Sequence, residues 1–483
     1  MKYYLGIDLG TSSIKVSLAD SSGSILDSES KDYPLILPRP NWSEQDPAEW
    51  KRALIEALGE LHKRHDLSQV ASLSFSGQMH GLVLLDENDN VIRPALLWND
   101  SRTVEEVDYL NQEIGTDLLL RETSNIALCG FTAPKVLWVY RNEPENFSRI
   151  AKIMLPKDYL AYVISGTFAS DVSDLSGTLF FDVKKRDYSD KMLEILHIRR
   201  KQLPKICDSS EVIGTVCEKF SRLTGLSPNC KVVIGGGDQA VAATGTNTLQ
   251  AGDISISLGT SGVVFAPSKE YCFDPSGRIH SFRHTTGNFH LMGCTLSAMG
   301  SLKWFLEDVL ETKDYNKEIE AIGEDISDVL FLPYLMGERS PINDPRAKGS
   351  FENLSLFYKR SDLVKAVLEG ICFSLYDVYS VMKEDGVSAK EARVIGGGSK
   401  NDKMMQMLSD IFGIRMKSIS TSDGGALGAI ILAMVGDGCF DNVYEASSQL
   451  VVDKKVFDPN PAKHALYEAK FLSYKEAYRK SKS

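Results

Sequence analysis

The sequence predicts an α/β protein built from two related domains, and three observations support this fold class. The chain has 483 residues, more than a single hydrophobic core usually organises. Strand-like and helix-like segments alternate from the N-terminus to about residue 245. The pattern Leu-Gly-Ile-Asp-Leu-Gly-Thr-Ser-Ser-Ile at residues 5–14 is echoed by Ile-Ser-Ile-Ser-Leu-Gly-Thr-Ser-Gly-Val at 254–263.

The chain opens with a predicted β-hairpin, followed by a helix and a third strand. Residues 2–8 and 14–20 are rich in β-formers and flank the turn Gly-Thr-Ser-Ser at 10–13. Residues 47–64 place apolar side chains at helical spacing after an Asp-Pro start signal. Residues 70–76 then favour a strand.

The second half continues with amphipathic segments. Residues 362–383 predict a long helix, and a short strand at 394–395 leads into a glycine-rich turn. Helices are expected over 402–412 and from 424, where small residues favour close packing. The lysine-rich tail, 464–480, predicts a helix whose charge is better explained as a solvated face than as a binding site.

The repeated pattern has two explanations. Short Gly-Thr-Ser turns are common, so a chance match is one of them. Duplication of a domain is the other, and the position of the second copy near the midpoint favours it. We therefore expect an N-terminal domain over residues 1–249 and a C-terminal domain over residues 250–483.

Composition and charge narrow the classes of partner. The formal net charge is −11 without any basic block, so neither nucleic acid nor an anionic membrane is an expected partner. The 8 cysteines form no Cys-x-x-Cys pair, which argues against a zinc site or a disulfide framework. No signal peptide or membrane-length apolar stretch is present, so we expect a cytoplasmic protein. Whether it forms a homodimer stays open.

The two Gly-Thr-Ser turns suit the binding of phosphate. Such turns expose backbone N–H groups and hydroxyls, and two of them could hold a triphosphate. No Walker sequence is present, so the chain is not a P-loop enzyme. The predicted phosphate-binding residues are Gly10, Thr11 and Ser12 in the first turn and Gly259 and Thr260 in the second.

Asp8 is the one carboxylate beside these turns, because the second copy has Ser257 at the matching position. Mg²⁺ is usually held by one or two carboxylates together with phosphates and water. Asp8 is therefore a candidate magnesium ligand. An ordinary strand-end aspartate that caps its own turn is the alternative.

Asp238 follows an apolar strand and three glycines, Gly235, Gly236 and Gly237. The glycines let a ligand approach the backbone, and α/β sheets place ligands at strand ends. Phosphoryl transfer needs a group that orients and deprotonates the attacking hydroxyl. Asp238 is the candidate general base, and a purely structural turn is the alternative.

Two further segments follow strand ends and carry polar and aromatic side chains. Gln78, Met79 and His80 combine hydrogen-bonding groups with apolar surface, which suits a hydroxylated ligand, although a lone histidine is often structural. Trp98 could stack on a sugar face or lie in the core.

A second glycine-rich turn follows the strand at 394–395. Gly397 and Gly398 would let a purine or ribose lie on the backbone, and Ser399 and Asn401 could bond to it. A plain strand–helix turn is equally consistent. The pattern is not Gly-x-Gly-x-x-Gly, so a dinucleotide fold is not supported.

In this order and spacing, the motifs resemble the FGGY carbohydrate kinases, most closely the xylulokinases of that family, over essentially the whole chain. The matching segments are 6–12, 42–47, 78–81, 97–102, 130–135 with Trp138, 155–160, 170–174, 257–262, 333–339 and 368–370.

The resemblance implies two ribonuclease-H-like domains of the actin, Hsp70 and hexokinase type that flank a catalytic cleft. It implies ATP-dependent phosphorylation of D-xylulose at its terminal hydroxyl, with the sugar on the N-terminal domain and ATP on the C-terminal one. The family's catalytic base falls on Asp238, and its N-terminal carboxylate falls on Asp8. Its ketose contacts fall on Met79, His80, Asp238 and the next residue, and its ATP contacts on Gly259, Thr260, Gly397, Gly398 and Asn401.

Gln239 departs from the pattern, because many xylulokinases carry Asn after the base and relatives that use glycerol carry Gln. Met79 and His80 still favour xylulose over glycerol. The alternatives are a kinase of the same family for another ketose or polyol, such as ribulose, a hexulose or glycerol, and a non-catalytic nucleotide switch. A switch should lack Asp238 and the segment 78–81, and both are present.

Overall fold

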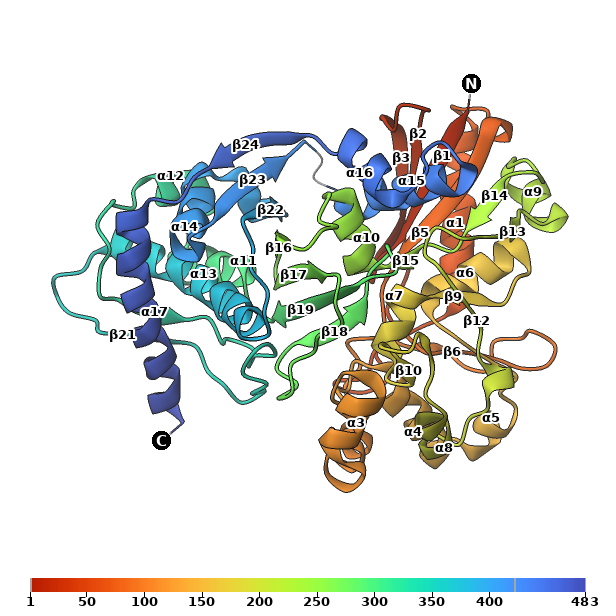
Figure 1. The fold of residues 1–483 in the computed structure, drawn as a ribbon, viewed down its shortest axis with the longest axis horizontal. Helices are drawn as coiled ribbons and strands as arrows, with labels where there is room; N and C mark the ends of the chain where they lie inside the picture. Colours follow the sequence, from red (N-terminus) through yellow and green to blue (C-terminus); the bar gives the residue numbers. More distant parts are fainter. Residues whose placement is uncertain (1, 421–422, 483) are drawn as a thin grey trace. The chain divides into compact units, whose positions relative to one another are not determined.

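The computed structural model describes residues 2–420 and 423–482, which fold into two units (Figure 1). The first unit contains the described residues up to Leu249 together with Ser281–Phe289 and Asp423–Val451. The second unit contains the rest. The chain therefore divides after residue 249, as expected. The first unit also includes two segments from later in the chain, which were not expected.

The first unit is built on a sheet with strand order β13-β14-β5-β1-β2-β3, and β15 pairs with the end of β5. β1 and β2 form the predicted antiparallel hairpin, and β5 runs parallel to β1. The strands are β1 (Tyr3–Leu9), β2 (Ser13–Ala19), β3 (Ile25–Asp32), β5 (Val70–Gly77), β13 (Val212–Thr215), β14 (Lys231–Val233) and β15 (Gly236–Gly237).

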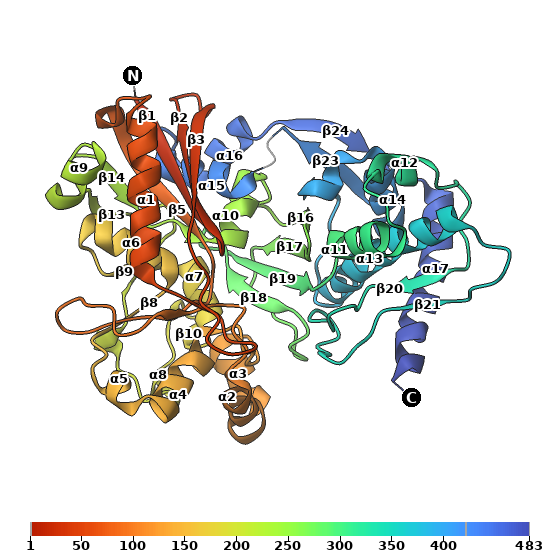
Figure 2. The same cartoon turned by 180° about the vertical axis from the view of Figure 1, so that it is seen from behind.

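Helices cover both faces of this sheet because side chains alternate along β1. Leu5, Ile7 and Leu9 join a core that also contains residues of α1, α6 and α9. Figure 2 labels these helices beside the sheet. Tyr4 faces the other side and packs with Ile430 of α15. The helices are α1 (Pro47–His62), α6 (Pro156–Ser165), α9 (Glu218–Thr224), α10 (Asp238–Gly245), α15 (Gly424–Asp437) and α16 (Val443–Leu450).

Between β5 and β13 the chain forms shorter elements that belong to the same unit. The helices in this stretch are α2 (Val104–Asp108), α3 (Thr116–Thr123), α4 (Thr132–Asn142), α5 (Pro144–Ser148), α7 (Val172–Leu175) and α8 (Asp190–Ile195). Short strands pair locally, among them β9 (Ala169–Asp171) with β12 (Lys205–Cys207).

The second unit repeats the central arrangement of the first. Its strand order is β19-β17-β16-β22-β23-β24, in which β16 and β17 form an antiparallel hairpin and β22 runs parallel to β16. The elements are β16 (Asp253–Leu258), β17 (Gly262–Ser268), β19 (Phe289–Thr295), β22 (Glu391–Ile395), β23 (Arg415–Ile419), β24 (Asp453–Phe457), α11 (Met299–Trp304), α12 (Tyr315–Glu320), α13 (Arg360–Glu384), α14 (Asp402–Phe412) and α17 (Pro461–Ser481).

The repeated sequence pattern therefore reflects a repeated structure, and the explanation by chance is wrong. In both units the Leu-Gly-Thr-Ser segment joins an antiparallel hairpin whose first strand pairs in parallel with a later strand. The helices expected near residues 47, 362, 402, 424 and 464 are confirmed as α1, α13, α14, α15 and α17. None of the helices among the described residues is long and apolar enough to span a membrane.

Candidate active site

Side chains alternate between the two faces of the sheet along β1. Asp8 therefore points to the same face as Tyr4 and Gly6, the face that α15 covers. A Cβ atom on Gly6 would lie 2.6 Å from the carbonyl oxygen of Ala426, so glycine lets α15 approach closely. A Cβ atom on Gly425 would lie 3.4 Å from Oδ2 of Asp8. Asp8 therefore lies beside the first turn of α15.

The carboxylate of Asp8 has an unusual proton affinity. Burial raises its pKa to about 6, an effect that the Ser76 hydroxyl opposes and the charge of Asp423 reinforces. Asp423 itself pairs with Lys15, at 2.6 Å. Within the turn itself, the N–H of Gly10 donates to the carbonyl oxygen of Ser13 at 3.0 Å.

The first Gly-Thr-Ser turn is held by side chains from three later segments. Tyr33 donates its hydroxyl proton to the carbonyl oxygen of Gly10. Gln45 donates to the carbonyl oxygen of Thr11 at 2.6 Å, and Trp98 donates to the Thr11 hydroxyl at 2.9 Å. Trp98 is 42% exposed, so the expectation of a core residue is wrong.

Asp238 is the first residue of α10 and directly follows β15. Its Oδ1 atom accepts the N–H of Gln239 at 2.7 Å. Burial, reinforced by the negative charge of Asp8, raises the pKa of Asp238 to about 7. Asp238 and Asp8 thus share one electrostatic environment, and Asp238 titrates near neutral pH.

The segment Gln78–His80 continues from the end of β5 and lies against the peptide that precedes Asp238. A Cβ atom on Gly237 would lie 2.9 Å from both Cγ and Sδ of Met79. Gln78 donates to Gln45 at 3.2 Å, which links this segment to the first turn. The predicted residues of the first unit are therefore brought together where β1, β5 and β15 end.

His80 is held in a fixed orientation. Its backbone has φ of 68°, and its carbonyl oxygen accepts from Lys135 at 3.0 Å and from Thr132 at 3.1 Å. Its Nδ1 atom lies 2.7 Å from the carbonyl oxygen of Gly177, which can only accept, so Nδ1 carries the proton. Burial lowers the pKa of Lys135 to about 7.

In the second unit, the Gly259–Thr260 turn packs against the start of α11. The carbonyl oxygen of Thr260 accepts from the N–H groups of Ala298 at 2.8 Å and Gly300 at 3.0 Å. A Cβ atom on Gly398 would lie 2.9 Å from Cβ of Leu258, next to the turn. The two predicted ATP segments of this unit therefore meet where β16 and β22 end.

Ser399 and Asn401 also make local bonds. Ser399 donates its hydroxyl proton to the carbonyl oxygen of Gly396 at 2.8 Å. Asn401 caps α14, since its Oδ1 atom accepts the N–H of Met404 at 3.1 Å. These bonds fix the turn that Gly397 and Gly398 occupy.

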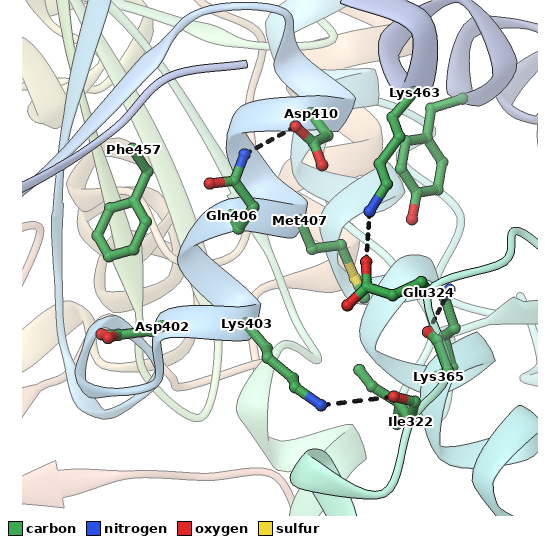
Figure 3. Close-up of a pocket in the computed structure, with 12 residues that line it drawn as sticks. Ile322, Glu324, Lys365, Asp402, Lys403, Gln406, Met407, Asp410, Phe457 and Lys463 are labelled. Atoms are coloured by element: carbon green, nitrogen blue, oxygen red, sulfur yellow. Dashed lines mark hydrogen bonds and ion pairs between the residues drawn. The ribbon is translucent and has the colours of Figure 1, made fainter. Parts of the chain in front are cut away.

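A surface pocket of about 290 Å³ in the second unit uses different residues (Figure 3). It is bordered by α14 and by three lysines, all of which already bond to the protein. Lys463 pairs with Glu324 at 2.6 Å, and Lys365 and Lys403 donate to backbone carbonyl groups. The ammonium groups that border this pocket are therefore already engaged in bonds within the protein.

Three residues around the first-unit site were not singled out from the sequence as site residues: Gln45, Lys157 and Ser173. Gln45 bridges the first turn and Gln78, and its Oε1 atom also accepts from Trp50 at 2.9 Å. All three lie in segments that match the family, and all three are polar residues with little or no exposure. Polar residues among apolar neighbours in matched segments are the signal that could have identified them.

Comparison with known proteins identifies the family of the chain. The N-terminal domain model of the FGGY family of carbohydrate kinases matches residues 3–245, and the C-terminal domain model matches residues 254–436. The xylulose kinase of Escherichia coli strain K12 is 38% identical over 480 residues, covering 99% of this chain and 98% of that protein.

Solved structures share the fold over nearly the whole chain. A Brucella ovis protein described as a "xyloylose kinase" is 33% identical with a TM-score of 0.94, covering 99% of both chains. A gluconate kinase from Lactobacillus acidophilus is 28% identical with a TM-score of 0.94, covering 99% of this chain and 97% of that one. These structures confirm the expected fold class of two ribonuclease-H-like α/β domains. The matches are to carbohydrate kinases, so the alternative of a non-catalytic nucleotide switch is not supported. The chain belongs to the FGGY family of carbohydrate kinases.

Proposed function

We propose that the chain phosphorylates D-xylulose with ATP to give D-xylulose 5-phosphate, with Asp238 as the general base. The contact between Met79 and Gly237 carries the proposal. Because of this contact, the segment Gln78–His80, which resembles the ketose-binding segment of the family, lies against Gly237, the residue before Asp238. The E. coli relative that is named a xylulose kinase, alignable over the full chain, supports the choice of sugar.

Asp238 has the properties that the transfer requires. A general base works best when its pKa lies near the working pH, and the pKa of Asp238 is about 7. Its carboxylate would accept the proton of the terminal hydroxyl as that oxygen attacks the γ-phosphorus of ATP in line. Its place at the start of α10 fixes the carboxylate on a regular element rather than on a loop.

His80 is suited to orient the sugar. Nδ1 donates to the carbonyl oxygen of Gly177, which fixes the orientation of the imidazole beside the segment that carries Met79. The ring centroids of Phe131 and Phe282 lie 4.8 and 6.1 Å from that of the imidazole, at tilted angles of 42° and 56°. Gln78 and Trp98 would supply further polar and stacking contacts.

In the second unit, ATP would bind through Gly259, Thr260, Gly397, Gly398, Ser399 and Asn401. In the first unit, the turn Gly10 to Ser12 is likewise suited to bind phosphate. Magnesium would be held by Asp8. Asp8 fits this ion because it is a buried carboxylate beside the first Gly-Thr-Ser turn, and magnesium is usually held by one or two carboxylates together with phosphates and water. When bound, magnesium neutralises charge on the phosphates.

Another sugar of the family is the second candidate. Gln239 occupies the second position of α10, directly beside the base, and its amide reaches one methylene further than that of asparagine. The gluconate kinase with the same fold illustrates that this architecture accommodates different substrates.

A screen of ADP release separates these candidates. The purified chain is mixed with ATP, Mg²⁺ and, one at a time, D-xylulose, D-ribulose, hexuloses, gluconate and glycerol. The proposal expects the highest kcat/KM for D-xylulose and a 5-phosphate product. A higher kcat/KM for any other compound replaces D-xylulose as the substrate, and no sugar-stimulated turnover at all rejects the kinase assignment.

A further inference from the structure

A fully buried lysine lies beneath both segments that carry the proposed sugar site. The side chain of Lys157 has no exposure to solvent. Its stem packs against the end of β5, where a Cβ atom on Gly77 would lie 2.7 Å from Cβ of Lys157. Gly77 pairs with Gly237 of β15 in the parallel register. Lys157 therefore touches the strand end that leads to Met79 and His80.

A chain of hydrogen bonds continues from Lys157 to the peptide before Asp238. Nζ of Lys157 lies 2.9 Å from Oδ1 of Asp171. The other carboxylate oxygen, Oδ2, accepts the Ser173 hydroxyl proton at 2.5 Å and the Ser173 N–H at 2.8 Å. The N–H of Gly237 donates to Oγ of Ser173 at 3.1 Å.

The direction of each bond in this chain is fixed by chemistry. A serine hydroxyl has one proton, and Ser173 gives it to Asp171, so its lone pairs are available to the Gly237 N–H. The contact is close, because a Cβ atom on Gly236 would lie 2.7 Å from Oγ of Ser173. Ser173 therefore anchors the Gly236–Gly237 peptide, one peptide before α10 begins, and the position of that peptide influences where the Asp238 carboxylate lies.

We propose that Ser173, Asp171 and Lys157 are positioning residues that hold Asp238 against the reacting hydroxyl. The proposal rests on the proposed function of Asp238 as the base. It assigns a role to the matched segments 155–160 and 170–174, which contain none of the predicted site residues. Lys157 lies in α6, Asp171 ends β9 and Ser173 lies in α7, and Figure 1 shows where these elements lie in the fold.

Ser209 provides a matched control. It is as buried as Ser173 and donates to the same Oδ2 atom of Asp171, at 2.7 Å. Its bond to Asp171 is therefore comparable, but the hydrogen bond from Gly237 goes to Ser173. Replacing either serine with alanine should lower the free energy of unfolding by a similar amount. Only the Ser173 variant should leave the Asp238 carboxylate less well positioned.

The test compares Ser173→Ala with Ser209→Ala by steady-state kinetics and thermal unfolding. We expect Ser173→Ala to lower kcat by about 10- to 100-fold, the scale of a misplacement near 1 Å, with the KM for ATP changed by less than about 2-fold. Ser209→Ala should keep kcat within about 2-fold of the wild type at a similar loss of Tm. Equal kcat values for the two variants would overturn the proposal.

Two additions keep the outcome unambiguous. If Ser173→Ala does not fold, the pair Ser173→Cys and Ser209→Cys replaces it, and equal kcat values again reject the positioning role. Asp238→Ala is measured alongside with the best sugar of the screen. An active Asp238→Ala variant rejects the proposed base itself, whereas an inactive one together with a normal Ser173 variant rejects only the positioning residues.

Discussion

Nζ of Lys157 lies 2.9 Å from Oδ1 of Asp171, and neither side chain is exposed to solvent. Asp158 and Asp174 approach the same ammonium at 2.6 and 3.5 Å. Burial alone would lower the pKa of Lys157, but the three carboxylates outweigh this effect and raise it. One permanent cation therefore stabilises a group of buried carboxylates next to the proposed base.

Replacing Lys157 with Met keeps the apolar stem and removes the cation. The free energy of unfolding should fall by about 3–5 kcal/mol, as is usual when one partner of a buried ion pair is lost. Burial holds the pKa values of Asp158 and Asp174 above their usual range. Ionisation of these groups is therefore penalised in the folded state, and the loss should be larger at pH 8 than at pH 5.

Urea unfolding at both pH values measures this effect. Lys191→Met is the control, because Lys191 forms an exposed pair with Glu194 at 2.8 Å and should contribute less than about 1 kcal/mol. A similar loss in the two variants would contradict the assignment of Lys157 as the essential cation.

Replacing Asp238 with Ala should lower kcat by at least the roughly 10²–10⁴-fold typical of general base catalysis. Binding of ATP should persist, because the predicted ATP residues lie mainly in the second unit. Asp190→Ala is a matched control, since Asp190 is likewise the first residue of a helix but is 81% exposed. Coupled ADP assays and nucleotide titration measure both variants, and near-normal sugar phosphorylation by Asp238→Ala would reject the base.

The sequence predicted the hairpins, the main helices and the residues at the ends of β1, β5 and β15, because each leaves a local trace in spacing or turn composition. The glycines before Asp238 and the apolar strand ahead of them are such a trace. Residues 281–289 and 423–451 joining the first unit could not be predicted, since their association depends on long-range packing rather than on local pattern.

The hydrogen bonds that join Lys157, Asp171, Ser173 and Gly237 could not be predicted from local sequence pattern either. Ser173 is separated from Gly237 by more than sixty residues, so the hydrogen bond between them depends on the tertiary fold. Trp98 shows the same limit, because its hydrogen bond to Thr11 crosses from one strand end to another. From the sequence alone, a Trp98 that stacks on a sugar could not be distinguished from a Trp98 buried in the core.

The pKa of Asp238, about 7, predicts an acid limb in the pH profile. The carboxylate must be ionised to accept a proton, so kcat/KM for the sugar should rise with pH and level off above about 7. Initial rates from pH 5 to pH 9 at saturating ATP measure the profile. A flat profile down to pH 5 would place the pKa of the base near that of an ordinary aspartate.

The same shift predicts that the base destabilises the fold. The pKa of Asp238 in the folded chain, about 7, exceeds the roughly 3.9 of an unfolded aspartate, so the folded state binds more protons between these values. The contribution of Asp238 to stability therefore falls as pH rises through this window. Asp238→Asn should be more stable than the wild type at pH 8, on the order of 4 kcal/mol, and equal to it below about pH 4.

Thermal unfolding at pH 4, 6 and 8 tests this prediction. Asp190→Asn, which alters an exposed pair with Arg200, should show no comparable change with pH. A stability difference between Asp238→Asn and the wild type that stays constant from pH 4 to pH 8 would show that the effect does not arise from ionisation.

The helix that carries Asp238 depends on close packing against α15. A Cβ atom on Gly428 would lie 1.9 Å from the carbonyl oxygen of Val241, a backbone atom that cannot move without shifting α10. Gly428→Ala should therefore cost about 1–3 kcal/mol or more of unfolding free energy and lower kcat, because Asp238 begins the displaced helix. Gly59→Ala is the matched control, since Gly59 lies within α1 with no atom inside 4 Å of its added Cβ. That change should stabilise the chain by about 0.5–1 kcal/mol with activity unchanged, because alanine favours a helix over glycine. Urea unfolding and coupled ADP assays on both variants measure these effects, and a Gly428→Ala variant as stable and active as Gly59→Ala would contradict the packing account.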